Sequence, residues 1–206
     1  MKYPLAAAYV TVVSLCLATA SFAQVKINQS RPNVNIRTFD PKHPTKEMPK
    51  LQPGEAAVTD SGFSCAVQIE VEITSTDDGK AQMKVTGMDV DLALDVTMWL
   101  PTNCPAKIRA HESGHRQISE DFYKNADEIA KSIAKKYIGK TATVASADKK
   151  DTQATMQRWG DEFCGEYQGQ TEVPSEKVQK RYDELTDHGR NTVPEKKAIE
   201  QAEAHK

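Results

Sequence analysis

The stretch that decides the fold is His111-Glu112-Ser113-Gly114-His115, an H-E-x-x-H pentapeptide inside a long amphipathic segment. Two imidazoles four residues apart lie on one face of an α-helix, where both can bind a single metal ion. The glutamate between them then lies beside the open position of that metal. In a chain with five His residues, the pattern arises by chance in about one sequence in a hundred. The surrounding residues therefore have to support it.

The residues around the pentapeptide have the periodicity of a buried helix face. Apolar residues and the two histidines recur at every third or fourth position, namely at Ile108, His111, His115, Ile118, Phe122, Ala126, Ile129, Ile133 and Tyr137. Both imidazoles are therefore expected to point at the core, where unpartnered polar groups cost free energy and one metal ion would satisfy both. We predict one long helix that opens at Asn103 or Cys104 with Pro105 and closes at Gly139 as a left-handed cap.

Gly114 is the unusual residue of this helix, because glycine costs a helix interior about 1 kcal/mol relative to alanine. Either a strand or a substrate approaches closely at this position, or the glycine is tolerated without a role. The sequence leaves both interpretations open.

Two segments upstream of the helix alternate between apolar and polar residues, which is the pattern of half-buried strands. The apolar residues of the first segment are Cys65, Val67, Ile69, Val71 and Ile73. Those of the second segment are Met88, Val90, Leu92, Leu94, Val96, Met98 and Leu100. The turn sequence Asp77-Asp78-Gly79-Lys80 lies between them, so we predict an antiparallel hairpin or small meander. Asp89, Asp91 and Asp95 on the polar face are expected to face solvent, because their spacing matches no calcium loop.

The first residues have the features of a secretory signal peptide, with a lysine at position 2, an apolar run and small residues before a cleavage site after Ala23. The run is too short to span a bilayer comfortably, so we expect a periplasmic or secreted protein without stable membrane insertion. Residues 24–61 are polar and Pro-rich and are predicted to form an extended arm with at most one short strand. Residues 62–206 are predicted to form a single domain. The net charge of −2 and a pI near 6.2 argue against nucleic acid as a partner.

Three cysteines remain after signal cleavage, and an oxidising compartment favours a disulfide between two of them. Cys104 with Cys164 is the preferred pair, because both flank or occupy helices expected to pack around the pentapeptide. Cys65 with Cys164 is the alternative, and three buried thiols are the remaining possibility.

Two further helices are predicted after the long one. The first covers about Asp148 to Tyr167, with Met156, Trp159 and Phe163 on one side. The second starts at Ser175 and carries an inward stripe of Val178, Tyr182, Leu185 and His188, with Gly189 directly behind as its end. The polar run from Glu195 to Lys206 is expected to be a helix or a frayed tail.

A catalytic zinc ion takes three protein ligands and keeps one position for water. A third ligand is therefore needed besides the two histidines of the pentapeptide. The extended metzincin motif is absent, because Ile118 and Asp121 occupy the positions of its Gly and His. Glu162 or Glu166 on a later helix could serve. His188 is the better candidate, because it is an inward imidazole at the end of a helix.

The pentapeptide is followed by Tyr182-Asp183-Glu184-Leu185-Thr186-Asp187-His188-Gly189, a Y-D-x-x-T-x-H-G element. This pairing resembles a family of small exported bacterial proteins predicted to be zinc-dependent proteases. The resemblance covers roughly Pro101 to Gly189. It implies that His111 and His115 are metal ligands, that Glu112 is the base and that the downstream element forms the second half of the site. It implies no particular substrate.

The chemistry of such a site suggests a role for each residue. Zinc lowers the pKa of a bound water towards about 7, and Glu112 would take the proton of that water and pass it to the leaving amine. Tyr182 could donate a hydrogen bond to the developing oxyanion, or it could pack in the core. Asp183 or Asp187 could orient a ligand imidazole, or they could be solvated helix residues.

Together these features predict an α+β fold of the zincin type, with a small antiparallel sheet packed on the long H-E-x-x-H helix and two further helices. The predicted function is an exported zinc metallopeptidase acting on a peptide or protein substrate. Its Zn²⁺ would be bound by His111, His115 and His188, with Glu112 and Tyr182 as catalytic residues. The alternatives are a non-catalytic periplasmic zinc-binding protein, or a structural or interaction module in which the motif is accidental.

Overall fold

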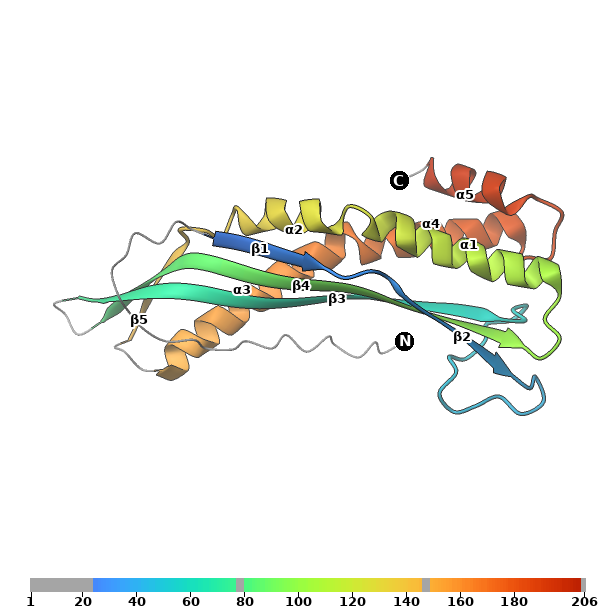
Figure 1. Cartoon of the computed structure of the whole chain (residues 1–206), viewed down its shortest axis with the longest axis horizontal. Coiled ribbons are helices and arrows are strands. Elements are labelled where there is room, and N and C mark those ends of the chain that lie inside the picture. Colours follow the sequence, from blue (N-terminus) through green and yellow to red (C-terminus); the bar gives the residue numbers. More distant parts are fainter. Residues whose placement is uncertain (1–23, 77–79, 146–148, 205–206) are drawn as a thin grey trace. The chain divides into compact units, whose positions relative to one another are not determined.

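The computed structural model describes residues 24–76, 80–145 and 149–204 (Figure 1). The predicted signal peptide, residues 77–79 of the predicted turn and residues 205–206 lie outside the described residues. The described chain forms two compact units. Unit 1 consists of the described residues of Met1–Ser30, Ser64–Leu92 and Ala126–Gly169, and unit 2 of those of Arg31–Phe63, Ala93–Asn125 and Gln170–Lys206. Across both units, none of the described helices has the length and hydropathy of a membrane-spanning segment.

Unit 1 combines strands with two helices. It contains β1 (Gln24–Gln29), most of β3 (Val58–Ser75), the first half of β4 (Ala81–Pro101), α2 (Ala126–Ala134), β5 (Thr141–Val144) and α3 (Lys149–Gln170). Strand β1 pairs with β4 in parallel, with Val25 opposite Met88. Strand β5 pairs with β4 antiparallel, with Ala81 opposite Val144. Cys65, Val67 and Ile69 of the first alternating run and Met88, Val90 and Leu92 of the second are buried here, as a period of two predicts. Towards the end of β3 the burial is lost, and Ile73 is 45% exposed.

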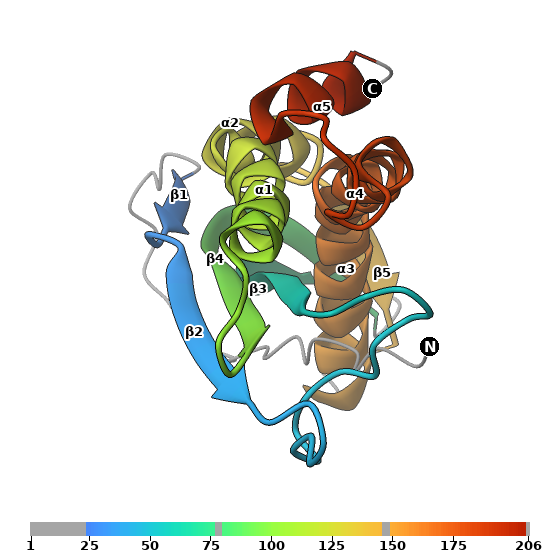
Figure 2. The ribbon, with the colours of Figure 1, turned by 90° about the vertical axis from the view of Figure 1, so that its right-hand side faces the viewer.

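Unit 2 combines strand ends with the helix that carries the pentapeptide. It contains β2 (Asn33–Phe39), the start of β3, the second half of β4, α1 (Ala106–Tyr123), α4 (Glu172–Thr186) and α5 (Glu195–Glu203). Helices α1, α4 and α5 pack on one another (Figure 2). Their shared core is Ile118, Val178, Tyr182, Ala198, Ile199 and Ala202. The C-terminal run is therefore a docked helix through Glu203, one of the two outcomes that the sequence allowed.

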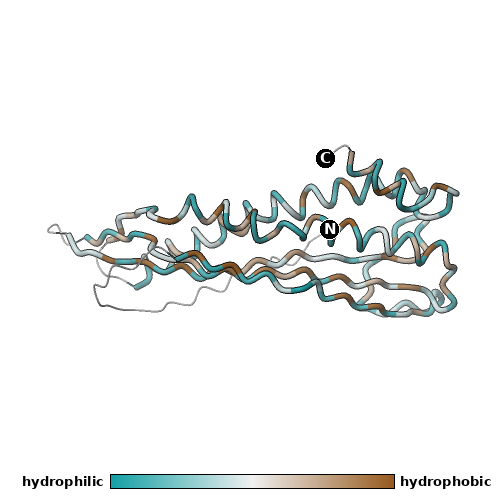
Figure 3. Tube along the Cα trace, turned by 45° about the horizontal axis from the view of Figure 1, so that its top comes forward, coloured by the Kyte–Doolittle hydropathy of each residue, from teal (hydrophilic) through white to brown (hydrophobic). Residues whose placement is uncertain are grey.

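The sheet corrects the predicted antiparallel arrangement. β3 pairs with β4, as the two alternating runs predict. However, β1 and β2 both pair with β4 in parallel, the latter with Val34 opposite Val96. Figure 3 shows hydrophobic and hydrophilic residues alternating along the strands, and this alternation assigns faces but not the direction of a partner strand.

The predicted extended arm is also corrected, because residues 24–61 contain β1 and β2 and the start of β3. Each of the first two strands has only one short alternation of β-branched residues between polar ones, which is too short a pattern to stand out. Polar side chains on these strands meet the aspartates of β4. Asn28 donates to Asp89 and Asp91 at 2.7 and 2.9 Å, and Asn33 donates to Asp95 at 2.7 Å.

The predicted long helix is two helices, α1 and α2, separated by a turn at Lys124 and Asn125. The apolar stripe steps across this turn without a change of period, so the sequence pattern does not reveal the break. Gly139 has the predicted left-handed conformation, with φ of 81°. It lies five residues beyond Ala134, the last residue of α2, and its amide donates to the carbonyl of Val85 at 2.9 Å.

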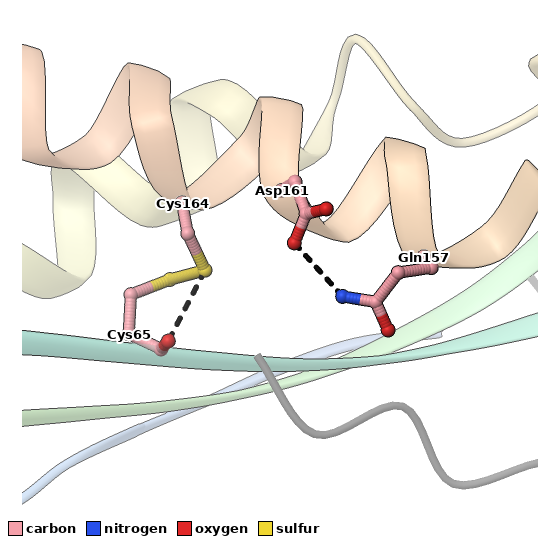
Figure 4. Close-up of a disulfide and its surroundings, with 4 residues drawn as sticks. All are labelled: Cys65, Gln157, Asp161 and Cys164. Atoms are coloured by element: carbon pink, nitrogen blue, oxygen red, sulfur yellow. Dashed lines mark hydrogen bonds between the residues drawn. A yellow bond between two sulfur atoms is a disulfide. The ribbon is translucent and has the colours of Figure 1, made fainter. Parts of the chain in front are cut away.

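The disulfide joins Cys65 on β3 to Cys164 on α3, within unit 1 (Figure 4). Their Cα atoms are 5.6 Å apart although 99 positions separate them in the chain. The preferred pairing of Cys104 with Cys164 was wrong, and the alternative is correct. Cys104 lies before α1 in unit 2 and has no disulfide partner among the described residues. The spacing of cysteines could not reveal this, because it depends on which helix packs on β3.

Candidate metal centre

Three side chains of unit 2 converge on one point. The Nε2 atoms of His111 and His115, both from α1, are 3.1 Å apart. The Oδ1 atom of Asp183, from α4, is 3.2 Å from the first and 3.0 Å from the second. His111 is buried, with 3% exposure. The three residues form a group that could hold a metal ion.

The tautomer of His111 follows from its contact with Thr186. The Thr186 hydroxyl donates its single proton to the carbonyl of Tyr182, at 2.7 Å. Its oxygen therefore accepts from Nδ1 of His111, at 3.3 Å. A neutral His111 consequently carries its proton on Nδ1 and turns the lone pair of Nε2 towards the group.

Gln179 determines the tautomer of His115 in the same way. Its amide nitrogen donates to the carbonyl of His115 at 3.2 Å and to Oγ of Ser119 at 2.9 Å. A carbonyl oxygen can only accept, so the amide oxygen of Gln179 is the atom that faces Nδ1 of His115. His115 therefore also donates through Nδ1 and presents a bare Nε2.

Two nitrogen lone pairs and a carboxylate oxygen thus face one another at 3.0–3.2 Å. These three atoms could share a cation, whose charge would offset the repulsion between their lone pairs. Tetrahedral ligands about 2.0 Å from a zinc ion lie about 3.3 Å from one another, close to the observed separations. The residues present therefore fit a metal such as zinc.

The pKa values of Asp183 and His115 shift in opposite directions. Without a metal, burial raises the pKa of Asp183, but hydrogen bonds from His111 and His115 when their Nε2 atoms are protonated outweigh it and lower the pKa overall. Burial lowers the pKa of His115, but the carboxylate of Asp183 outweighs it and raises the pKa overall. A proton can consequently occupy the position between the three groups when no metal is bound.

Glu112, the predicted base, lies buried beside the group, and burial raises the pKa of its carboxyl. The hydroxyl of Thr59, on β3, donates to its Oε2 at 2.7 Å. Thr59 belongs to the segment predicted as an arm, and no sequence signal marked it as part of the site.

Tyr182 packs against both imidazoles. Its ring stacks on that of His111, with 4.9 Å between centroids and an angle of 10°, and meets that of His115 edge-on at 5.0 Å. The fully buried hydroxyl donates to Glu195. A Cβ atom on Gly114 would lie 2.6 Å from Cζ of Tyr182. Gly114 is therefore required by the close approach of a helix, and the role of Tyr182 as an oxyanion donor stays a prediction.

His188 lies next to the group but outside it. It belongs to three consecutive left-handed residues, with φ of 49° at Asp187, 52° at His188 and 76° at Gly189. The buried Nδ1 of His188 makes no hydrogen bond with the described part of the chain. Asp183 Oδ1, at 3.5 Å, and Glu55 Oε1, at 3.9 Å, are charged atoms near it. Its role as a metal ligand stays a prediction.

The structure brings together most of the residues that the two motifs singled out. Glu162 and Glu166, the alternative ligands, lie on α3 in unit 1, where they pair with Lys140 and Lys136. Asp183, which the sequence suggested only as an orienting carboxylate, instead supplies the third atom of the group.

Gln179, Asp183 and Thr186 were missed as a set, although they recur at the helical spacing of three and four along α4. Each of the three comes directly after a residue of the predicted apolar stripe of this helix, so the stripe itself does not include them. Comparison with protein-family models, with curated proteins and with solved structures finds no match to this chain.

Proposed function

We propose that this chain is an exported zinc-dependent peptidase with a zincin-like site, in which His111, His115 and Asp183 bind the metal. The observation that carries the proposal is the convergence of two bare Nε2 atoms and one carboxylate oxygen at 3.0–3.2 Å. Two imidazoles and a carboxylate suit zinc, and three protein ligands leave one position for water. The predicted signal peptide and the disulfide support export to an oxidising compartment.

When bound, zinc supplies an acidified water and a Lewis acid for the scissile carbonyl. Glu112 lies next in sequence to one ligand, and Thr59 holds its Oε2, so Oε1 is the atom that takes the proton and returns it to the leaving amine. Thr186 and Gln179 keep the ligand imidazoles in the tautomer that binds metal.

The test combines metal analysis of the mature protein with cleavage of a peptide library. We expect near-stoichiometric zinc in the wild type and in Glu112→Gln, and peptide cleavage in the wild type alone. A folded protein that takes up no metal would refute the site. Folding and thermal stability unaffected by His111→Ala, by His115→Ala and by chelators would favour a structural module.

A non-catalytic zinc-binding protein is the second candidate, and His188 is the observation that favours it. Its Nδ1 has no hydrogen-bond partner in the described part of the chain and lies 3.5 Å from Asp183 Oδ1. A fourth protein ligand would close the position that water needs. In that case His188→Ala would weaken zinc binding, and Glu112→Gln would change no activity on any peptide. In a peptidase with three ligands, zinc affinity survives His188→Ala.

A further inference from the structure

The C-terminal helix α5 delivers a carboxylate to the back of the metal centre. Its first residue, Glu195, has a side chain that is only 17% exposed. One carboxylate oxygen accepts from the hydroxyl of Tyr182, and the other accepts from Nζ of Lys107 on α1. The Lys107 ammonium also donates to the carbonyl of Val193, at 2.9 Å. Glu195 therefore links α1 and α4 to the start of α5.

The hydroxyl that Glu195 accepts from belongs to the ring that contacts both ligand imidazoles. That ring is nearly parallel to His111 and nearly perpendicular to His115. Glu195 Oε2 is also 3.9 Å from Nδ1 of His111. An anchored hydroxyl limits the tilt of the Tyr182 ring, and the ring in turn limits the positions open to the two Nε2 atoms.

Glu195 reaches this place only when α5 is docked. The helix is held by Ala198, Ile199 and Ala202, which pack with Ile118 of α1 and Val178 of α4. The connection from α4 passes through the three left-handed residues that end at Gly189. Docking of α5 and the geometry of the metal centre are therefore coupled through one side chain.

We propose that Glu195 is a positioning residue of the metal centre and that docking of α5 sets the affinity for metal. This inference rests on the proposed zinc site. Groups that orient metal ligands from behind typically change metal affinity by about 10–100-fold when removed. Coupling is reciprocal, so metal binding should also tighten the docking of α5.

The experiment measures zinc affinity of the mature protein by competition with a chromophoric chelator. We expect Glu195→Ala to weaken binding by at least about tenfold, whereas Glu200→Ala, on the exposed face of the same helix, leaves it unchanged. Tyr182→Phe, which removes only the hydroxyl, should weaken binding similarly. The effects of Glu195→Ala and Tyr182→Phe should be less than additive in the double variant, because both variants remove the hydrogen bond between Glu195 and the Tyr182 hydroxyl.

Each outcome separates this inference from the site on which it rests. A wild-type protein that binds no zinc overturns both. Zinc binding with wild-type affinity in Glu195→Ala overturns the inference alone, and additive effects in the double variant overturn the route through Tyr182. If Glu195→Ala does not fold, hydrogen exchange of residues 195–203 in the wild type decides. Slower exchange with zinc supports the coupling, and unchanged exchange refutes it.

Discussion

Gly114→Ala tests whether the Tyr182 ring is held against α1. Alanine normally stabilises a helix interior by about 1 kcal/mol relative to glycine. Here the added Cβ would lie 2.6 Å from Cζ of Tyr182, and the ring is fully buried and anchored through its hydroxyl. Forcing an atom into such packing costs about 1–3 kcal/mol. Because the ring is fully buried and its hydroxyl is hydrogen-bonded, we expect the upper part of that range and a net loss of about 1–2 kcal/mol.

The matched control is Gly165→Ala, on α3, where a Cβ meets nothing within 4 Å. This substitution should stabilise the protein by up to about 1 kcal/mol. Thermal unfolding of the metal-free proteins separates the two, because about 1 kcal/mol moves Tm by about 2–4 °C in a domain of this size. A Gly114→Ala protein whose Tm rises like that of the control would refute the fixed ring. Zinc affinity of Gly114→Ala should fall as well, because the displaced ring contacts both imidazoles.

Three further predictions follow from the described contacts. Gly189→Ala should lower both Tm and zinc affinity, because its Cβ would lie 2.8 Å from that of His111 at a left-handed φ of 76°; unchanged values would contradict the close approach. Reducing the bond between Cys65 and Cys164 should cost about 4–5 kcal/mol, as expected for a loop this long; urea unfolding with and without reductant measures it, and equal midpoints would argue against the pairing. Without metal, protonated His115 stabilises the fold, because Asp183 raises the pKa of its imidazole in the folded state. This stabilisation is complete below the unfolded pKa of about 6.5 and is lost as pH rises through the raised pKa. Tm measured in chelator from about pH 6 to 9 should therefore fall, and a Tm that stays constant over this range would contradict the prediction.

The local elements of this fold were well predicted where a periodic pattern is long. The runs in β3 and β4, the start of α1 and the course of α3 all follow from apolar spacing. The predictions failed where the pattern is short, or where the same period continues from one element into the next. β1 and β2 have too few alternating residues to be recognised, and the turn at Lys124 and Asn125 leaves the helical period intact.

Only the part of the candidate site that lies on one helix could be predicted from the sequence. The histidines of the pentapeptide are placed on one face by helix geometry alone, so their convergence needs no further information. Asp183 and His188 both lie near the two imidazoles, and their placement depends on how α4 ends, with left-handed backbone at Asp187, His188 and Gly189. Backbone conformation after the last helical turn cannot be read from periodicity.

The sequence by itself determined the approximate course of α1 and α3 and which face of α1 carries both imidazoles, because these follow from contacts within a few residues. Only the tertiary structure decided that β1 and β2 pair in parallel with β4, that Cys164 meets Cys65, and that Asp183, Tyr182 and Glu195 gather around His111. These contacts join segments far apart in the chain. Their formation depends on the packing of whole elements, which no local pattern of residues encodes.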